Sequence, residues 1–253
     1  MTHKSKRGAA LLSVVLAAGV TGAQALAQSW TSQGPIPRFG HSAVLDPSTN
    51  RMIVFGGSPA TANETAPLND FGDLWILQGA GAAISVWTQL KPTGAKPAAR
   101  LEHGAVYDPT SNRMILFGGG LGQASPCAND SWTLINANGT GGTPAWIQVS
   151  PAGSPPAPRL RFASAYDSIT NTLIVFGGND CFSGFFNDAA VLSHANGLGG
   201  TPTWTTLNPS GALPSARADV SGVYDPSSNR LIIFGGGGLN EVWVLTNAKS
   251  SRQ

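Results

Sequence analysis

The sequence predicts an all-β protein made of four copies of one unit. An apolar line that ends in a glycine pair occurs four times, as NRMIVFGG, NRMILFGG, NTLIVFGG and NRLIIFGG. The last glycines of these lines, Gly57, Gly119, Gly178 and Gly236, are 62, 59 and 58 residues apart. Each copy also begins with an arginine that precedes an aspartate by eight residues. A fixed period of this size indicates a repeat architecture.

The first half of each unit is expected to be a β-hairpin. A strand rich in small residues is predicted over 37–46, 99–108, 158–167 and 216–225, and a short turn (PSTN, PTSN, SITN or PSSN) follows its aspartate. Asp, Pro, Ser and Asn favour such turns because they fix or tolerate the required backbone angles. The apolar line is then the second strand, and its nearly continuous β-branched character is typical of a strand covered on both faces.

The second half of each unit is expected to add two strands. The third is predicted over 71–77, 129–135, 187–193 and 240–246, and the fourth, which carries tryptophan, over 86–90, 145–149 and 203–207. Four antiparallel strands per unit, with glycine and aromatic residues at set positions, are typical of a β-propeller blade. The glycine pair and the tryptophan beyond it resemble kelch repeats over essentially the whole of residues 28–253. We therefore expect a kelch-type β-propeller with repeats at about 37–90, 99–149, 158–207 and 216–246.

The segment 29–33 resembles a fourth strand that has no unit of its own. It reads SWTSQ and is similar to VWTQL in the first unit, whereas the last copy stops after its third strand. We expect this segment to complete the last of four four-stranded blades, which would leave no exposed strand edge. The resemblance implies five to seven blades in most kelch propellers. Two alternatives therefore stay open: the chain is part of a larger propeller, or two chains complete one ring, although a monomer is favoured.

Residues 1–27 have the features of a signal peptide. Three basic residues precede an uncharged apolar run over about 9–20, and small residues at Ala25 and Ala27 fit a cleavage site. Neither this run nor any later stretch is long enough to predict a membrane span. Cleavage after Ala27 would leave 226 residues with 12 basic and 13 acidic side chains. This balance does not favour nucleic acid as a partner, and we expect a secreted or periplasmic protein.

The two cysteines are expected to form a disulfide. Cys127 follows the second glycine pair by eight residues, and Cys181 follows the third by three. Both therefore lie in loops that join the second and third strands of neighbouring blades, and these loops emerge on one face. An exported protein meets an oxidising environment. The bond requires the two Cα atoms to lie within about 7 Å.

Residues that recur in register are expected to serve packing rather than ligand binding. A side chain repeated at one position fills the same site between blades each time. The arginines that open the units are expected to bond loop carbonyl groups. These sets are Trp75, Trp132 and Trp243; Tyr107, Tyr166 and Tyr224; and Arg38, Arg100, Arg159 and Arg217.

A ligand site is expected where the repeats differ, because an asymmetric partner needs different groups from each blade. Two residues after each repeated arginine the chain has Gly40, Glu102, Arg161 and Asp219. The resemblance to kelch domains implies that this position lines the binding pocket. We take Arg161 as the anchor, since its guanidinium offers a forked donor to a carboxylate or sugar hydroxyl. The alternative interpretation is four unrelated exposed loop residues.

His41 and His103 share one repeat position and form a second candidate site. They could bind a ligand or metal from two adjacent blades, but a local hydrogen bond is favoured. The galactose oxidase propeller, which is kelch-like, would require two tyrosines, two histidines and a Cys–Tyr crosslink around copper. Only three histidines follow residue 27, and His194 is expected in a loop on the opposite face. We expect no metal site here.

The acidic loop 179–188 could form a calcium site, but comparison with the preceding repeat argues against this. Asn187 and Asp188 match Asn129 and Asp130, where they are expected to cap the start of the third strand. The sequence contains no nucleophile elbow, phosphate-binding glycine loop, Cys-x-x-Cys pair or pair of general-acid carboxylates. No catalytic residues and no cofactor are therefore expected.

The expected function is a binding or interaction module, with an unidentified protein or glycan partner on the loop face. An enzyme of the oxidase, epimerase or cyclase type is the alternative, since propellers host both classes.

Overall fold

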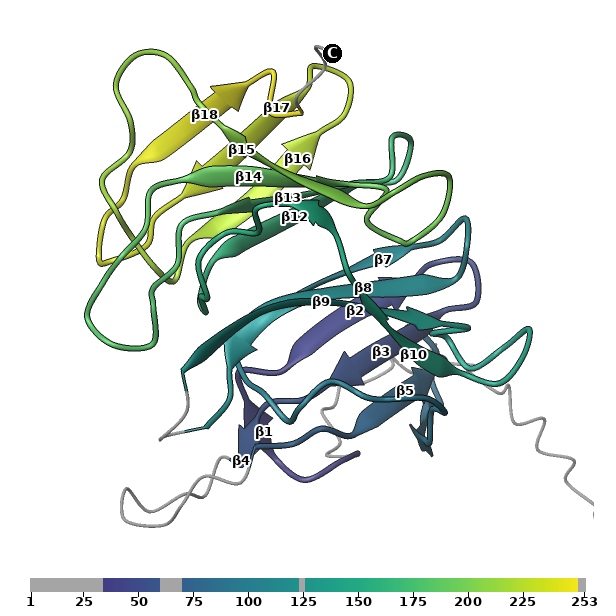
Figure 1. Ribbon diagram of the computed structural model, residues 1–253. Coiled ribbons are helices and arrows are strands. Elements are labelled where there is room, and N and C mark those ends of the chain that lie inside the picture. Colours follow the sequence, from purple (N-terminus) through teal and green to yellow (C-terminus); the bar gives the residue numbers. More distant parts are fainter. Residues whose placement is uncertain (1–33, 60–69, 123–125, 250–253) are drawn as a thin grey trace, which may run out of the picture. The chain divides into compact units, whose positions relative to one another are not determined.

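The computed structural model describes residues 34–59, 70–122 and 126–249 (Figure 1). Within these ranges every regular element is a β-strand. The strands form four antiparallel sheets, each built from a continuous stretch of sequence. The predicted signal peptide 1–27 and the predicted closing strand 29–33 lie outside the described residues.

Three of the four sheets have four meandering strands, and the fourth sheet has three among the described residues. The first sheet contains β2 (Ser42–Asp46), β3 (Arg51–Phe55), β5 (Leu74–Gln78) and β6 (Val86–Leu90). The second contains β7 (Gly104–Asp108), β8 (Arg113–Gly120), β9 (Cys127–Ile135) and β10 (Ala145–Val149). The third contains β12 (Ala163–Asp167), β13 (Thr172–Phe176), β14 (Ala189–Ser193) and β15 (Thr203–Leu207). The fourth contains β16 (Ser221–Asp225), β17 (Arg230–Phe234) and β18 (Val242–Thr246).

Two short pairings complete the strand list. β1 (Arg38–Phe39) pairs with β4 (Ser58–Pro59) ahead of the first sheet. β11 (Ala152–Gly153) lies parallel to β15 and belongs to the segment that leads from the second sheet to the third. The second, third and fourth strands agree with the expected positions to within about three residues. The first strands are shorter than expected: only the last five residues of each predicted ten-residue segment form the first strand of its sheet.

The turn between the first two strands of each sheet is built by its aspartate and asparagine. Asp108 accepts hydrogen bonds from the Thr110 backbone N–H and the hydroxyl groups of Thr110 and Ser111. Asn112 follows with a φ of 51°, a conformation that asparagine tolerates better than most residues. The other three turns have an asparagine with a φ of 51° or 52° at the same position.

The hydrophobic core lies between the sheets. Each of its three clusters combines one face of a sheet with the facing side of the next sheet. Between the first and second sheets, Ile53, Phe55 and Ile76 pack against Leu134 and Trp146. The second strand is accordingly buried along its whole length in the third sheet, as the continuous apolar line predicts.

The first strands of successive sheets lie side by side. β2 contacts β7, β7 contacts β12, and β12 contacts β16. This serial arrangement of inner strands is typical of propeller blades. Among the described residues, none forms a helix of the length and apolar character needed to cross a bilayer.

Candidate functional site

The arginine that opens each unit is a buried structural anchor. Arg100 donates from Nη1 to the carbonyl oxygen of Gly118 at 2.8 Å, and its two terminal nitrogens reach the Asp130 carboxylate at 2.7 and 2.9 Å. Its side chain is fully buried, which makes this paired arrangement necessary. The equivalent pairs are Arg38 with Asp73, Arg159 with Asp188, and Arg217 with Glu241. The predicted bonds to loop carbonyls are confirmed in all four units.

The acidic partners of these arginines were missed in the sequence. Asp130 and Asp188 were interpreted as strand caps, whereas the structure shows them in ion pairs with Arg100 and Arg159. The sequence does contain a signal for these acidic partners, because an acidic residue lies two positions before the third-strand tryptophan in three units. Its carboxylate accepts the indole N–H of that tryptophan: Asp73 from Trp75, Asp130 from Trp132, and Glu241 from Trp243.

The candidate ligand residues lie in one row that joins the four sheets. We call Gly40, Glu102, Arg161 and Asp219 the entry row, because each precedes the first strand of its sheet. Their φ angles are 63°, 54°, 58° and 56°. The Glu102 N–H donates to the Gly40 carbonyl at 2.6 Å, the Arg161 N–H to the Glu102 carbonyl at 3.1 Å, and the Asp219 N–H to the Arg161 carbonyl at 2.9 Å.

The side chains of the entry row are held at a conformational cost. A positive φ suits glycine, as at Gly40, and is unfavourable for a residue with a Cβ by roughly 1–2 kcal/mol. Apart from Asn, Asp and His, the described residues with a positive φ and a side chain are Glu102, Arg161 and Cys181. Non-glycine residues in such conformations cluster at functional sites.

The three charged side chains of the row contact one another across sheets. Arg161 Nε donates to Glu102 Oε2 at 2.6 Å and lies 3.8 Å from Asp219 Oδ1. The hydrogen bond to Glu102 and the charges of both acids raise the pKa of Arg161. The anchor proposed from the sequence is therefore already paired with Glu102. Its side chain is 42% exposed, and that of Asp219 is 66% exposed.

A further carboxylate near the row had no signal in the sequence. Asp70 lies in the variable loop before β5, where the repeats offer no comparison. Burial raises the pKa of its carboxyl, and the nearby charge of Glu102 raises it further. The row and this neighbour together carry more acidic than basic groups.

The two histidines of the second candidate site lie in different environments. His41 is exposed, whereas His103 is buried. His103 Nε2 lies 2.8 Å from the hydroxyl oxygen of Ser42 in the first sheet, so it joins two sheets. Burial, assisted by the charges of Arg100 and His41, lowers the pKa of His103 to about 3. A hydrogen bond was expected at this position, but that of His103 joins two sheets and is not local.

The disulfide lies beside the entry row. Cys127 and Cys181 are bonded with their Cα atoms 5.5 Å apart, which confirms the predicted pairing. Cys127 begins β9, and Cys181 lies in the loop that follows β13. Leu160, the residue before Arg161, pairs with Asn179 in the same loop. The bond therefore ties together the loops of the second and third sheets next to Glu102 and Arg161.

Over the described ranges, no three His, Cys, Asp or Glu side chains gather closely enough to hold a metal ion.

A model of the KLHDC2/KLHL20/DRC7 kelch-repeats domain matches residues 14–236 of the sequence. The chain belongs to the kelch-repeat family. Its fold is likewise similar to that of a solved structure entitled "Structure of YjhT", with a TM-score of 0.60, 15% identity, and coverage of 84% of this chain and 64% of that one. The likeness to YjhT concerns the fold alone.

Curated proteins similar to this kelch-repeat chain are much longer. Host cell factor homolog hcf-1 of Caenorhabditis elegans is 32% identical over 57% of the chain, and tip elongation aberrant protein 1 of Schizosaccharomyces pombe is 26% identical over 87%. The human Rab9 effector protein with kelch motifs is 29% identical over 51%. The matched regions are 18%, 18% and 31% of these three proteins, respectively.

Proposed function

We propose that this kelch-repeat protein is an exported interaction module whose entry row binds a partner protein. The observation that carries the proposal is the entry row itself. At four equivalent backbone positions linked by hydrogen bonds, the chain has four different residues, three of them charged. By contrast, the arginine that opens each unit and the asparagine of its turn recur in all four units with the same contacts and conformation.

The chemistry of the row favours a ligand group that both donates and accepts hydrogen bonds. Arg161 uses Nε for Glu102, and within the described residues its two terminal nitrogens have no hydrogen-bond partner. Asp219 offers an exposed acceptor beside them. A peptide amide can satisfy both, accepting from Arg161 and donating to Asp219. The surplus of acidic groups further favours a partner with a basic side chain.

Two further observations support this assignment. One relative is named as an effector of Rab9, which is a role in protein interaction. The signal-like residues 1–27 and the disulfide agree with export, because disulfides persist in oxidising compartments. A glycan partner, the other class expected from the sequence, is an outcome of the experiment below.

A phage-displayed random peptide library panned on the folded mature protein tests the proposal. We expect selected peptides to carry basic residues and to lose roughly 5- to 150-fold in affinity when Arg161 is replaced by alanine, as for a lost charge-assisted bond of about 1–3 kcal/mol. Arg230→Ala is the matched control, because Arg230 is also exposed but begins β17 at the opposite end of its sheet. Equal affinities for both variants would contradict the proposal. Binding to a glycan array alone, lost in the Arg161 variant, would reassign the partner class.

A further inference from the structure

A loop of the third sheet exposes two phenylalanines close to the entry row. Phe182 and Phe185 are 78% and 53% exposed, and both lie in the segment 181–185 between β13 and β14. We call this segment the aromatic loop. Apolar side chains scattered singly over a surface are common, but two aromatic rings in one short segment form an apolar group of the kind that marks an interaction site.

The packing of the third sheet does not account for these two rings. The ring that the fold uses here belongs to the next residue, Phe186, which lies over the buried guanidinium of Arg159 at 4.3 Å. Among the described residues, neither Phe182 nor Phe185 belongs to one of the three hydrophobic clusters between the sheets. Their exposure therefore calls for a role outside the core.

Backbone pairing places the aromatic loop beside the entry row. Leu160, which precedes Arg161, exchanges two backbone hydrogen bonds of 3.0 Å with Asn179. Asn179 pairs in turn with Phe185. Neighbouring strands are spaced by about 5 Å, so the backbone of Phe185 lies roughly 10 Å from that of Leu160, a distance that about three residues of extended chain span. One extended segment of a partner can therefore reach both the aromatic loop and the entry row.

The position of Phe185 differs between the repeats, as the entry row does. It lies three residues before the acidic partner of the repeated arginine, and the four units have there Asp70, Cys127, Phe185 and Gly238. The arginines and their acidic partners hold every unit in the same way, whereas this position changes from unit to unit. It forms a second line of unit-specific groups next to the entry row.

The aromatic loop is fixed at both its backbone and its side chains. Asp180 Oδ1 accepts the backbone N–H groups of Phe182 and Gly184, both at 2.9 Å, and the Asp180 N–H donates to the Gly184 carbonyl at 3.0 Å. Cys181 is bonded to Cys127 of the second sheet. A loop that is already fixed loses less conformational entropy when it binds, so its aromatic side chains contribute more to affinity.

The charges around the aromatic loop are mainly acidic. Asp180 lies at the start of the loop, and Glu102 and Asp219 lie on the entry row. The basic group between these two, Arg161, is already paired with Glu102 at 2.6 Å. An apolar group bordered by acids is complementary to an apolar side chain that has a basic residue near it.

We propose that the aromatic loop is the apolar part of the partner-binding surface and takes an apolar side chain of a partner protein segment whose basic residue contacts the entry row. This inference rests on the function proposed above and adds the class of side chain that the partner carries beside its basic residue. The apolar and basic residues of that segment lie within about four positions of each other, because roughly 10 Å of extended chain separates the two contacts.

Parallel panning of the random peptide library on the mature protein and on a Phe182→Ser variant tests the inference. We expect the wild-type pool to combine an apolar and a basic residue at the stated spacing, and the variant pool to keep the basic residue without the apolar one. A wild-type pool enriched in basic residues alone overturns the inference and leaves the proposed function intact. An apolar preference that persists without any dependence on Arg161 contradicts the proposed role of the entry row instead.

One peptide from the wild-type pool then measures the size of the contribution. Phe182→Ser is expected to weaken its binding by at least about tenfold, as for truncation of an interface aromatic side chain. Ile169→Ser is the matched control, because Ile169 is 83% exposed in the same sheet but lies in the turn at its opposite end, between β12 and β13. Both side chains are exposed, so both variants should keep the melting temperature of the wild type. Equal affinities of the two variants overturn the inference.

Discussion

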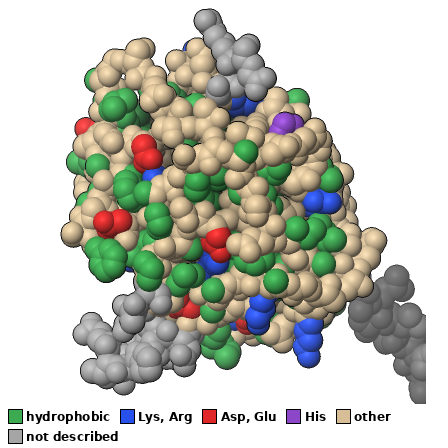
Figure 2. Space-filling model, in the orientation of Figure 1, with side chains coloured by type: hydrophobic (Ala, Val, Ile, Leu, Met, Phe, Trp, Pro, Cys, Tyr) green, Lys and Arg blue, Asp and Glu red, His purple; other side chains and the backbone are tan. Residues whose placement is uncertain are grey.

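The junction between the second and third sheets and the outer side of the fourth sheet have equivalent residues in different surroundings. Phe117 in the junction is 1% exposed, whereas Phe234, at the same repeat position, is 54% exposed. Val242 pairs with Phe234, Val223 and Val244 lie on the same face of the sheet, and all three valines are also exposed. We call these four residues the open flank. Each unit has an apolar side that a following sheet can cover. The burial of the residues on that side therefore depends on whether a neighbouring sheet is present. Figure 2 shows apolar side chains scattered over the face of the molecule in view.

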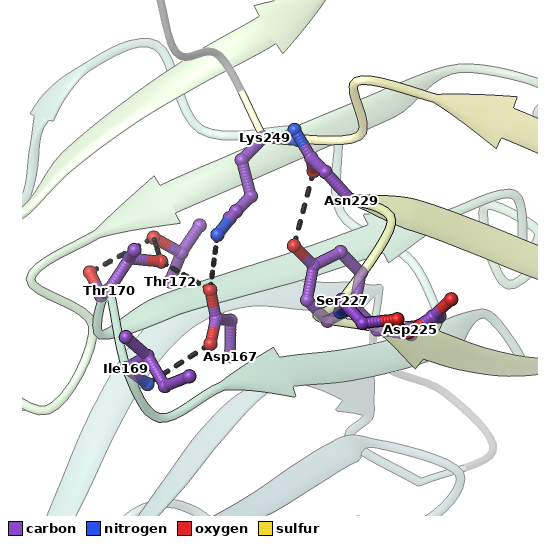
Figure 3. Close-up of polar contacts among 9 residues, drawn as sticks. Asp167, Ile169, Thr170, Thr172, Asp225, Ser227, Asn229 and Lys249 are labelled. Atoms are coloured by element: carbon purple, nitrogen blue, oxygen red, sulfur yellow. Dashed lines mark hydrogen bonds and ion pairs between the residues drawn. The ribbon is translucent and has the colours of Figure 1, made fainter.

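The polar links differ between the two regions in the same way. Each of the three junctions between consecutive sheets joins the turn aspartate of one sheet to a side chain after the third strand of the next: Asp46 to Asn138 and Asp108 to Asn196, both at 2.7 Å, and Asp167 to Lys249 at 2.5 Å. Figure 3 shows Lys249 reaching Asp167, whereas Asp225 bonds within its own turn, to Ser227 and Ser228. Among the described residues, Asp225 therefore has no donor from another sheet.

The largest expected effect comes from the paired phenylalanines. Phe117→Ala should lower the free energy of unfolding by about 3–5 kcal/mol, because it leaves a cavity beside Trp204. Phe234→Ala should cost less than about 1 kcal/mol, because the Phe234 side chain is 54% exposed and leaves no buried cavity when it is truncated. Urea unfolding of the two variants measures both values. Equal costs for the two variants would mean that Phe234 is covered in solution.

The ion pairs of Arg100 and Arg217 are expected to differ less in their contribution to stability than the two phenylalanines do. Arg100→Ala should cost about 3 kcal/mol, because it leaves the partly buried Asp130 carboxylate without its cation. The Arg217 partner, Glu241, is 47% exposed, against 28% for Asp130. Water can therefore solvate Glu241, and Arg217→Ala should cost less stability than Arg100→Ala. Thermal unfolding at neutral pH compares the two variants, and a larger loss for Arg217→Ala would reverse the assignment.

The smallest expected effect is a pH dependence at the first junction. The folded pKa of His103 is lowered to about 3, below the usual value near 6.5. The folded state therefore binds the proton less well than the unfolded state. Its stabilising contribution is complete above about pH 6.5 and is lost as the pH falls towards 3. His103→Phe copies the residue of the third unit, Phe162, and should flatten the decline in stability between pH 6.5 and 4.5, by roughly 1 kcal/mol per pH unit. An unchanged slope would contradict this expectation.

A second loss of stability is expected below pH 4. It should occur both in the wild-type chain and in the His103→Phe variant, which distinguishes it from the effect of His103. Burial alone would raise the pKa of Asp108, but hydrogen bonds from Ser111, Thr110 and Asn196 lower it overall. Its stabilising contribution is present above the unfolded value near 4 and is lost as the pH falls below it.

Local sequence signals were sufficient for much of the fold. The strands follow from alternating turn and apolar segments, and the disulfide from two loops at equivalent places in neighbouring sheets. The state of Arg161 was not predictable, because its pairing with Glu102 depends on the spacing of two sheets and joins residues 59 positions apart in the sequence. Likewise, nothing local to the fourth unit reveals that its outer side is exposed, since its apolar line is as complete as the others.

Gly81 makes the outer side of the first sheet unlike the other sheets. It is the first-sheet counterpart of Asn138, Asn196 and Lys249, since its N–H also bonds the turn asparagine of its own sheet, Asn50. Having no side chain, Gly81 cannot donate the hydrogen bond that the other three give to the turn aspartate of the preceding sheet. A second protein or subunit that packed on this side would therefore have to be held without that bond, and denaturant should release it before it separates the described sheets.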